Sequence, residues 1–108
     1  MNKFNKKQNR GLTEIYRRLN YFHKGNLNER LMYLAYPSEA KVLRDLGLIQ
    51  PYGSEIRRAL NWYSLTERGK RFFSKYIAPI NEEENEALFN GEYIIFDIEL
   101  YLQSWIDV

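Results

Sequence analysis

Basic side chains occur at two places in the chain where they could bind a polyanion such as nucleic acid. Lys41 and Arg44 are three residues apart in a short segment with helical periodicity, so both can point away from its apolar face. Arg57 and Arg58 follow a cluster of turn-forming residues. Lysine and arginine donate to phosphate oxygens and to guanine, and arginine also suits a narrow minor groove. This pattern predicts binding chemistry directed at nucleic acid.

The charges of the chain are divided between two regions. Residues 1–78 hold all 16 Lys and Arg but only six of the 14 acidic residues, which gives this region a net charge of +10. Residues 79–108 hold the other eight acidic residues and no base. A basic body of this kind favours a polyanionic partner, whereas the acidic tail must face different surroundings.

Few residues in the sequence could carry out catalysis. His23 is the only histidine, and a histidine near the end of a helix more often complements the helix dipole than acts as a base. The acidic run at residues 82–86 lacks the alternation and the glycine of a calcium loop. Neither a glycine-rich phosphate loop nor a nucleophile elbow is present. We therefore expect no enzymatic activity, no metal site and no cofactor.

Length and composition indicate one small folded unit in the cytoplasm. The chain has 108 residues, of which 44% are hydrophobic and 16% are aromatic, enough for one core. Its apolar runs are far shorter than the roughly 20 residues that cross a bilayer, so we expect no membrane association. Residues 1–10 lack the apolar stretch of a signal peptide, and the absence of cysteine suits a reducing compartment.

The first part of the chain is predicted to contain a loose basic arm followed by a helix. Residues 1–11 are basic, and Phe4 is their only large apolar side chain, so they are expected to be a flexible arm. From about residue 13 to residue 24, Ile15, Leu19 and Phe22 recur at helical spacing. The first helix is therefore expected to begin after the arm.

Two further helices are predicted to form a helix-turn-helix. Asn26 and Glu29 have the spacing of a capping box, so residues 27–36 are predicted to be helical up to Pro37. Ser38 then caps a short helix that ends at Gly47, a residue suited to a left-handed C-terminal position. Short helices joined by a tight turn are typical of the helix-turn-helix motif.

A hairpin and another helix are predicted to follow. Leu48 and Ile49 begin an extended segment, residues 51–54 form a turn cluster, and residues 59–65 are rich in apolar and aromatic side chains. Thr66 is placed to cap a helix that continues until Pro79. The predicted order is helix, helix, helix, strand, turn, strand, helix, a mainly α fold with a small β-hairpin in the α+β class.

Two segments in this order carry a resemblance to a known family. Residues 43–49 read Leu-Arg-Asp-Leu-Gly-Leu-Ile, and residues 57–70 read Arg-Arg-Ala-Leu-Asn-Trp-Tyr-Ser-Leu-Thr-Glu-Arg-Gly-Lys. Together, over about residues 12–77, they resemble bacterial winged-helix transcription regulators, in particular the multiple-antibiotic-resistance and phenolic-acid regulator groups. The resemblance implies a winged helix-turn-helix whose third helix enters the major groove of DNA and whose hairpin, the wing, contacts phosphates or the minor groove.

On this resemblance, the residues expected to contact double-stranded DNA lie on the third helix, on the wing and on the helix after it. Local pairing of Lys41 and Arg44 with acids on the same helix is an alternative, and Lys70 and Arg71 could instead mark a solvated helix face. The expected DNA-binding residues are Ser38, Lys41, Arg44, Tyr52, Ser54, Arg57, Arg58, Lys70 and Arg71.

The tail is expected to pack on the 12–78 domain or on a second copy. Within residues 79–108, the apolar side chains from Ile94 to Leu102 alternate as in a strand, but they also fit one face of a helix. We favour a helix over about residues 95–105. Relatives commonly form homodimers through the ends of their chains, and the residues expected at such an interface are Tyr93, Phe96, Ile98, Tyr101, Leu102 and Trp105.

The sequence is therefore most consistent with a sequence-specific double-stranded DNA-binding protein that regulates transcription as a homodimer. One alternative is an accessory DNA-binding protein of a mobile element, acting at an origin of plasmid transfer or replication, because the chain has no obvious ligand-binding domain. A second alternative is a winged helix that binds another protein through its acidic, aromatic tail and does not bind DNA.

Overall fold

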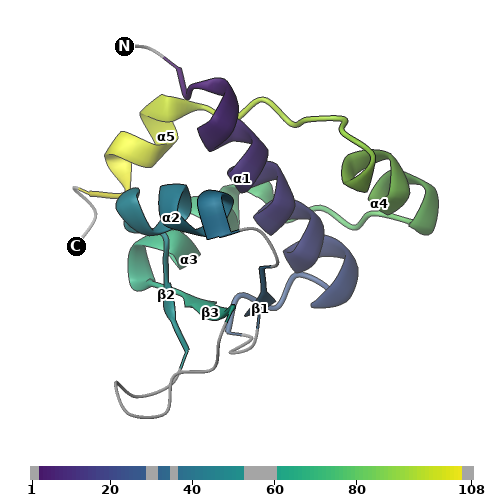
Figure 1. Ribbon diagram of the computed structural model, residues 1–108, viewed down its shortest axis with the longest axis horizontal. Coiled ribbons are helices and arrows are strands. Elements are labelled where there is room, and N and C mark those ends of the chain that lie inside the picture. Colours follow the sequence, from purple (N-terminus) through teal and green to yellow (C-terminus); the bar gives the residue numbers. More distant parts are fainter. Residues whose placement is uncertain (1–2, 29–31, 35–36, 53–60, 106–108) are drawn as a thin grey trace.

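The computed structural model describes residues 3–28, 32–34, 37–52 and 61–105 (Figure 1). These residues form a mainly helical α+β structure with a small antiparallel sheet. Within them, no helix is long and apolar enough to cross a membrane. The elements, in chain order, are α1 (Lys6–Arg17), the π-helical turn η1 (Arg18–Phe22), β1 (Met32–Tyr33), α2 (Pro37–Asp45), β2 (Ile49–Pro51), β3 (Trp62–Leu65), α3 (Glu67–Phe73), the 3-10 turn η2 (Ser74–Tyr76), α4 (Glu82–Phe89) and α5 (Ile98–Gln103).

The first helix begins well before residue 13, so the prediction of a flexible arm over residues 1–11 is wrong for residues 6–11. Asn5 and Gln8 form a reciprocal capping box, in which the Asn5 side chain accepts from the Gln8 amide and the Gln8 side chain accepts from the Asn5 amide. Phe4 is only 7% exposed and packs edge-on against the rings of Phe72 and Tyr101. Its burial anchors the start of α1 to the core.

The predicted helix over residues 27–36 is wrong where the structure describes this segment. Met32 and Tyr33 form β1, which pairs with Tyr63 and Trp62 of β3. The side chain of Asn26 accepts from the backbone amide of Asn28 and so closes a turn, not a capping box. Pairing with the distant strand β3 therefore satisfies the backbone of Met32 and Tyr33, for which the local periodicity predicted a helix. Among the described residues, no separate helix lies between η1 and α2.

The predicted hairpin is confirmed in its described part. Within the described residues, β1, β3 and β2 form an antiparallel sheet in that order, and Ile49 of β2 pairs with Leu65 of β3. Pro51 lies on the edge strand β2, where the missing amide of proline is tolerated. The sheet lies below α2 in the view of Figure 1.

The core lies where α1, α2 and α3 meet. Gly11 of α1 faces Leu43 of α2 so closely that a Cβ at position 11 would lie 3.2 Å from the Leu43 Cγ atom. This absence of a side chain lets the two helix backbones approach. The fully buried side chains that fill the centre are Leu12, Ile15, Leu19, Leu43, Leu48, Phe72 and Phe73.

The C-terminal region packs back onto α1. Asn81 caps α4 by accepting from the amide of Glu84, and the acidic run forms the first turn of this helix. The helix expected over residues 95–105 is shorter, since Asp97 accepts from the Glu99 amide and starts α5 at Ile98. Figure 1 shows α4 and α5 at opposite ends of the molecule.

A strap formed by residues 92–97 joins α4 to α5 and runs along α1. The side-chain amide of Asn9 donates to the Ile94 carbonyl and accepts from the Phe96 amide. The hydroxyl of Thr13 accepts from the Ile94 amide. The side chains of α1 thus bind backbone groups of the strap that a neighbouring strand would bind in a sheet.

Candidate nucleic-acid interface

The exposed face of α2 carries three of the predicted DNA-binding residues. Ala40 and Leu43 are 1% and 0% exposed and form the buried face of the helix. Ser38, Lys41 and Arg44 follow one another at intervals of three residues on the opposite, exposed face. The amphipathic pattern of the sequence therefore places these three side chains in solvent.

Lys41 and Arg44 differ in how they are paired. The Nζ atom of Lys41 lies 3.0 Å from Oδ2 of Asp45, and both side chains are largely exposed. An exposed pair of this kind contributes about 0–1 kcal/mol, so a stronger anion can displace it. Arg44 is exposed and forms no ion pair with any acid that the structure describes. Arg44 is therefore the better placed of the two to receive a phosphate.

A basic hollow of about 250 Å³ lies where the start of α1 meets the start of α2. Lys6, Lys7 and Arg10 from α1 line it together with Ser38 and Glu39 from α2. Sequence reasoning had treated these three basic residues as part of a loose arm. The Asn5–Gln8 capping box was the signal that could have placed them on a helix. We call this hollow and the exposed face of α2 the basic face.

Glu39 is the one acid that lines the basic hollow. Burial raises the pKa of its carboxyl above the usual value; Glu14 adds to the rise, and Arg10 opposes it. A negative charge at this position weakens the attraction of the hollow for an anion. The hollow therefore becomes more basic when Glu39 is protonated or neutralised.

The base of the hairpin is fixed to the end of α2 by hydrogen bonds from Thr66. The Thr66 hydroxyl donates to the Gly47 carbonyl and accepts from the Gly69 amide, which caps α3 as the sequence predicted. The Thr66 amide donates to the Leu48 carbonyl at 3.0 Å. These bonds set the direction in which β2 and β3 leave the body relative to α2.

A second polar hollow lies beside the hairpin. It measures about 460 Å³, and its lining includes Tyr52, Ser64 and Lys70. Tyr52 and Lys70, both predicted to bind DNA, are therefore brought together, although Lys70 also lies 3.3 Å from the Glu67 carboxylate. The predicted wing residues Ser54, Arg57 and Arg58 lie outside the described residues.

Arg71, predicted to bind DNA, is half-buried and makes a contact within the molecule. Its Nη2 atom donates to the carbonyl of Ser104 just after α5, and its Nε atom is buried. Arg68, one turn earlier in α3, also makes a contact within the molecule, because its guanidinium lies 3.3 Å from the centroid of the Trp105 ring. Both arginines hold α5 against α3.

Arg17 also has a structural role that the charge count did not reveal. It is only 4% exposed, pairs with Glu14 at 2.8 Å and donates to the side chain of Asn85 in α4. Its guanidinium also lies over the ring of Phe89. Some of the basic side chains in residues 1–78 therefore hold helices together, and their charge is not available to a ligand.

The fold buries some of the residues predicted at the dimer interface and leaves others exposed. Phe96 and Tyr101 are 2% and 8% exposed within their own chain, because their rings pack on Phe72, so their assignment to an interface is corrected. Ile98 is half-buried. Tyr93, Leu102 and Trp105 remain substantially exposed, and Ile95, which was not predicted, is 84% exposed.

Comparison of the chain with protein-family models, with curated proteins and with solved structures finds no significant match.

Proposed function

We propose that the protein binds double-stranded DNA through its basic face, in the manner of a winged-helix protein. The observation that carries this proposal is the meeting of two elements. The start of α1 brings Lys6, Lys7 and Arg10 next to the N-terminal end of α2, whose exposed side carries Lys41 and Arg44. Phosphate contacts of this kind supply much of the affinity of a protein for duplex DNA.

The arrangement around α2 supports the winged-helix reading. A helix with one exposed face is followed directly by an antiparallel hairpin, and the Thr66 hydroxyl bonds the base of the hairpin to the end of this helix. A first strand pairs with the returning strand of that hairpin. In this reading α2 lies in the major groove, and the hairpin, which carries β2 and β3, reaches the adjacent backbone or minor groove.

We propose that the DNA-bound form is a homodimer that regulates transcription at a specific site. Tyr93, Leu102 and Trp105 supply exposed apolar surface for a second copy. A two-fold dimer places two copies of α2 on one side of the duplex, as a palindromic site requires. Arg44 is the residue that we assign to base or phosphate contact from α2.

Fluorescence anisotropy with a labelled duplex of a few tens of base pairs and random sequence tests the proposal. The variant Lys7→Ala, Arg44→Ala removes two charges from the basic face at helical positions where alanine is well tolerated. The control variant Lys24→Gln, Lys75→Gln removes two charges from exposed lysines elsewhere. We expect the first variant to lose about tenfold or more in affinity and the control to lose about twofold.

Arg57→Ala, Arg58→Ala forms a third arm of the experiment and tests the wing separately. Loss of affinity in this variant, with the oligomeric state unchanged, supports a wing contact. Absence of binding by the unsubstituted chain at low salt contradicts the proposal and favours the protein-interaction alternative. Equal losses of DNA affinity in the basic-face variant and in the control variant would contradict a specific role of the basic face, because they would depend only on the net charge of the protein.

A further inference from the structure

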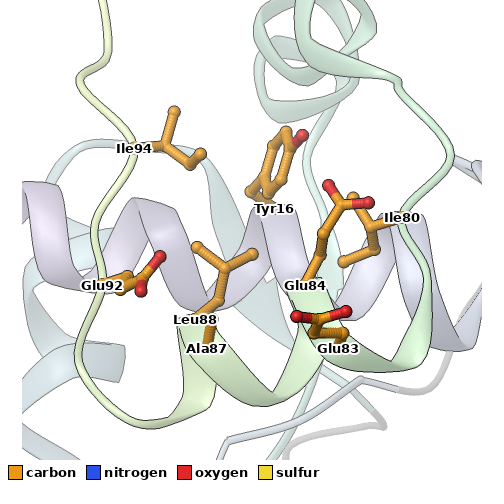
Figure 2. A pocket seen from close by; sticks show the side chains of 8 residues that line it. All are labelled: Tyr16, Ile80, Glu83, Glu84, Ala87, Leu88, Glu92 and Ile94. Carbon is orange, nitrogen blue, oxygen red and sulfur yellow. The ribbon is translucent and has the colours of Figure 1, made fainter.

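A third hollow, of about 350 Å³, lies between α1 and α4 and has no lining residue from α2 (Figure 2). Its floor is apolar, and its rim is acidic. A volume of this size lies at the lower end of the range of small-molecule sites. The lining residues are Tyr16, Ile80, Glu83, Glu84, Ala87, Leu88, Glu92 and Ile94.

The shape of the hollow follows from the helical spacing of α4 and from the turn after it. Glu83, Ala87 and Leu88 fall on one face of α4, which turns towards α1. Gly91 then adopts a positive φ of 110°, and the Glu92 amide donates to the Ala87 carbonyl at 3.1 Å. This turn brings the chain back, so that Figure 2 shows Glu92 on one side of Leu88 and Glu83 on the other.

No base among the described residues forms an ion pair with the acidic rim. Among the described residues, the acids in ion pairs are Glu14, Asp45 and Glu67, none of which lines this hollow. The positive end of the helix dipole accounts for acids in the first turn of α4, but not for Glu92, which follows the helix. Uncompensated carboxylates on both sides of an apolar floor attract a group that is both cationic and apolar.

Tyr16 closes the hollow on the α1 side. The hydroxyl is neutral at physiological pH, and burial, with a further contribution from Glu84, raises its pKa above the ordinary value. Its ring stands between Ile94 and Ile80 in Figure 2. A neutral aromatic face adds to the attraction for a cation that enters above it.

We infer that this hollow is a binding site for a hydrophobic organic cation. The apolar body of the ligand covers Leu88 and Ile94, and its charge lies between the carboxylates of Glu83 and Glu92. The site is separate from the basic face and does not depend on the binding of DNA.

A matched pair of ions tests the inference on the full chain. Tetraphenylphosphonium and tetraphenylborate share one shape and carry opposite charges, so their comparison isolates the effect of charge. Isothermal titration calorimetry is expected to show binding of the phosphonium at micromolar to low millimolar concentration, weakened by Glu83→Gln, Glu92→Gln, whereas any binding of the borate, which the basic face can attract, is unchanged by these substitutions. No binding of the phosphonium, or an equal effect of the substitutions on the two ions, overturns the inference.

Paired variants locate the site on α4. Glu83→Gln, Glu92→Gln removes two charges from the rim, and Glu82→Gln, Glu86→Gln removes two exposed charges from the same helix outside the lining. We expect about a tenfold loss of phosphonium affinity in the first variant and at most about a twofold loss in the second. Equal losses contradict a site at this hollow, provided that circular dichroism shows both variants folded.

Sedimentation velocity of the same samples separates a ligand site from a subunit interface. A hollow that is occupied by a second copy gives a dimer that Glu83→Gln, Glu92→Gln dissociates and that excludes the phosphonium. That result overturns the inference. A sedimentation coefficient that is unchanged by these substitutions, together with selective phosphonium binding, supports it.

Discussion

Gly69 in α3 lies directly against the backbone carbonyl of Leu48, the residue that precedes β2. A Cβ atom at position 69 would lie 2.1 Å from the Leu48 oxygen, a distance at which backbone must move. The Thr66 amide donates to the same carbonyl. The packing of α3 against the base of the hairpin therefore depends on the absence of a side chain at position 69.

Gly69→Ala is accordingly expected to destabilise the protein by about 3 kcal/mol, because the clash involves backbone and not the end of a flexible side chain. Urea unfolding followed by circular dichroism measures the change. Gly11→Ala is the matched control: its new Cβ meets only the side chain of Leu43, and alanine favours the helix by up to about 1 kcal/mol. A cost at position 69 no greater than at position 11 contradicts the described contact.

Thr66→Ala is expected to lower stability by about 1–2 kcal/mol and to weaken DNA binding. The substitution removes the cap of α3 and the bond to the Gly47 carbonyl, which together orient the hairpin. Thr66→Ser keeps the hydroxyl and should behave almost as the unsubstituted chain. Denaturation midpoints and anisotropy of the three proteins provide the measurement, and similar losses in Ala and Ser variants would argue against the hydrogen bonds.

Glu39→Gln is expected to change the pH dependence of stability. Burial of Glu39, reinforced by Glu14 and opposed by Arg10, raises its pKa in the folded state, so the folded chain holds this proton more tightly than the unfolded chain. The contribution of Glu39 to stability is fully present below the ordinary value of 4.5 and is lost as pH rises through the raised pKa. Glutamine does not titrate, so the variant gains stability relative to the unsubstituted chain as pH rises.

Thermal unfolding at about pH 4 and pH 7 checks this expectation. Glu82→Gln, at an exposed position on α4, is the control and should show little change. Glu39→Gln should also strengthen DNA binding at pH 7, because it removes the negative charge from the basic hollow. A stability difference that is the same at both pH values would count against the burial of this carboxyl.

Leu102→Glu is expected to weaken the proposed homodimer without unfolding the chain. Leu102 is 48% exposed on α5, so a charge there opposes an apolar subunit contact and has little effect on the core. Sedimentation equilibrium over a range of concentrations measures the shift towards monomer. Tyr101→Phe provides the contrast: the Tyr101 hydroxyl donates to the Leu46 carbonyl at 2.7 Å inside the chain, so its loss should reduce stability by about 1–2 kcal/mol without changing the oligomeric state.

The parts of the fold that were predicted correctly are those fixed by neighbouring residues. Thr66 and Gly69 cap α3 over three residues, and Gly47 ends α2 with a φ of 75°. These signals require only nearby backbone, so they can be interpreted without knowledge of the tertiary structure.

The predictions that were wrong depend on contacts between distant residues. Met32 pairs with Tyr63, far along the chain, and this pairing takes precedence over a helical periodicity that looked adequate locally. Phe4 is buried only because Phe72 and Tyr101 lie beside it. A count of charges likewise could not reveal that Arg71 bonds to the Ser104 carbonyl, or that α1 turns Lys6 and Lys7 towards α2.

The salt dependence of DNA binding tests the central claim most directly. Affinity for a random duplex should be measured over about 50–200 mM salt for the unsubstituted chain and for Lys7→Ala, Arg44→Ala. Each phosphate contact contributes roughly 0.9 to the slope of log affinity against log salt concentration, so the variant should show a slope smaller by about two. The same steep slope in both proteins, or no dependence on salt in either, contradicts DNA binding through the basic face.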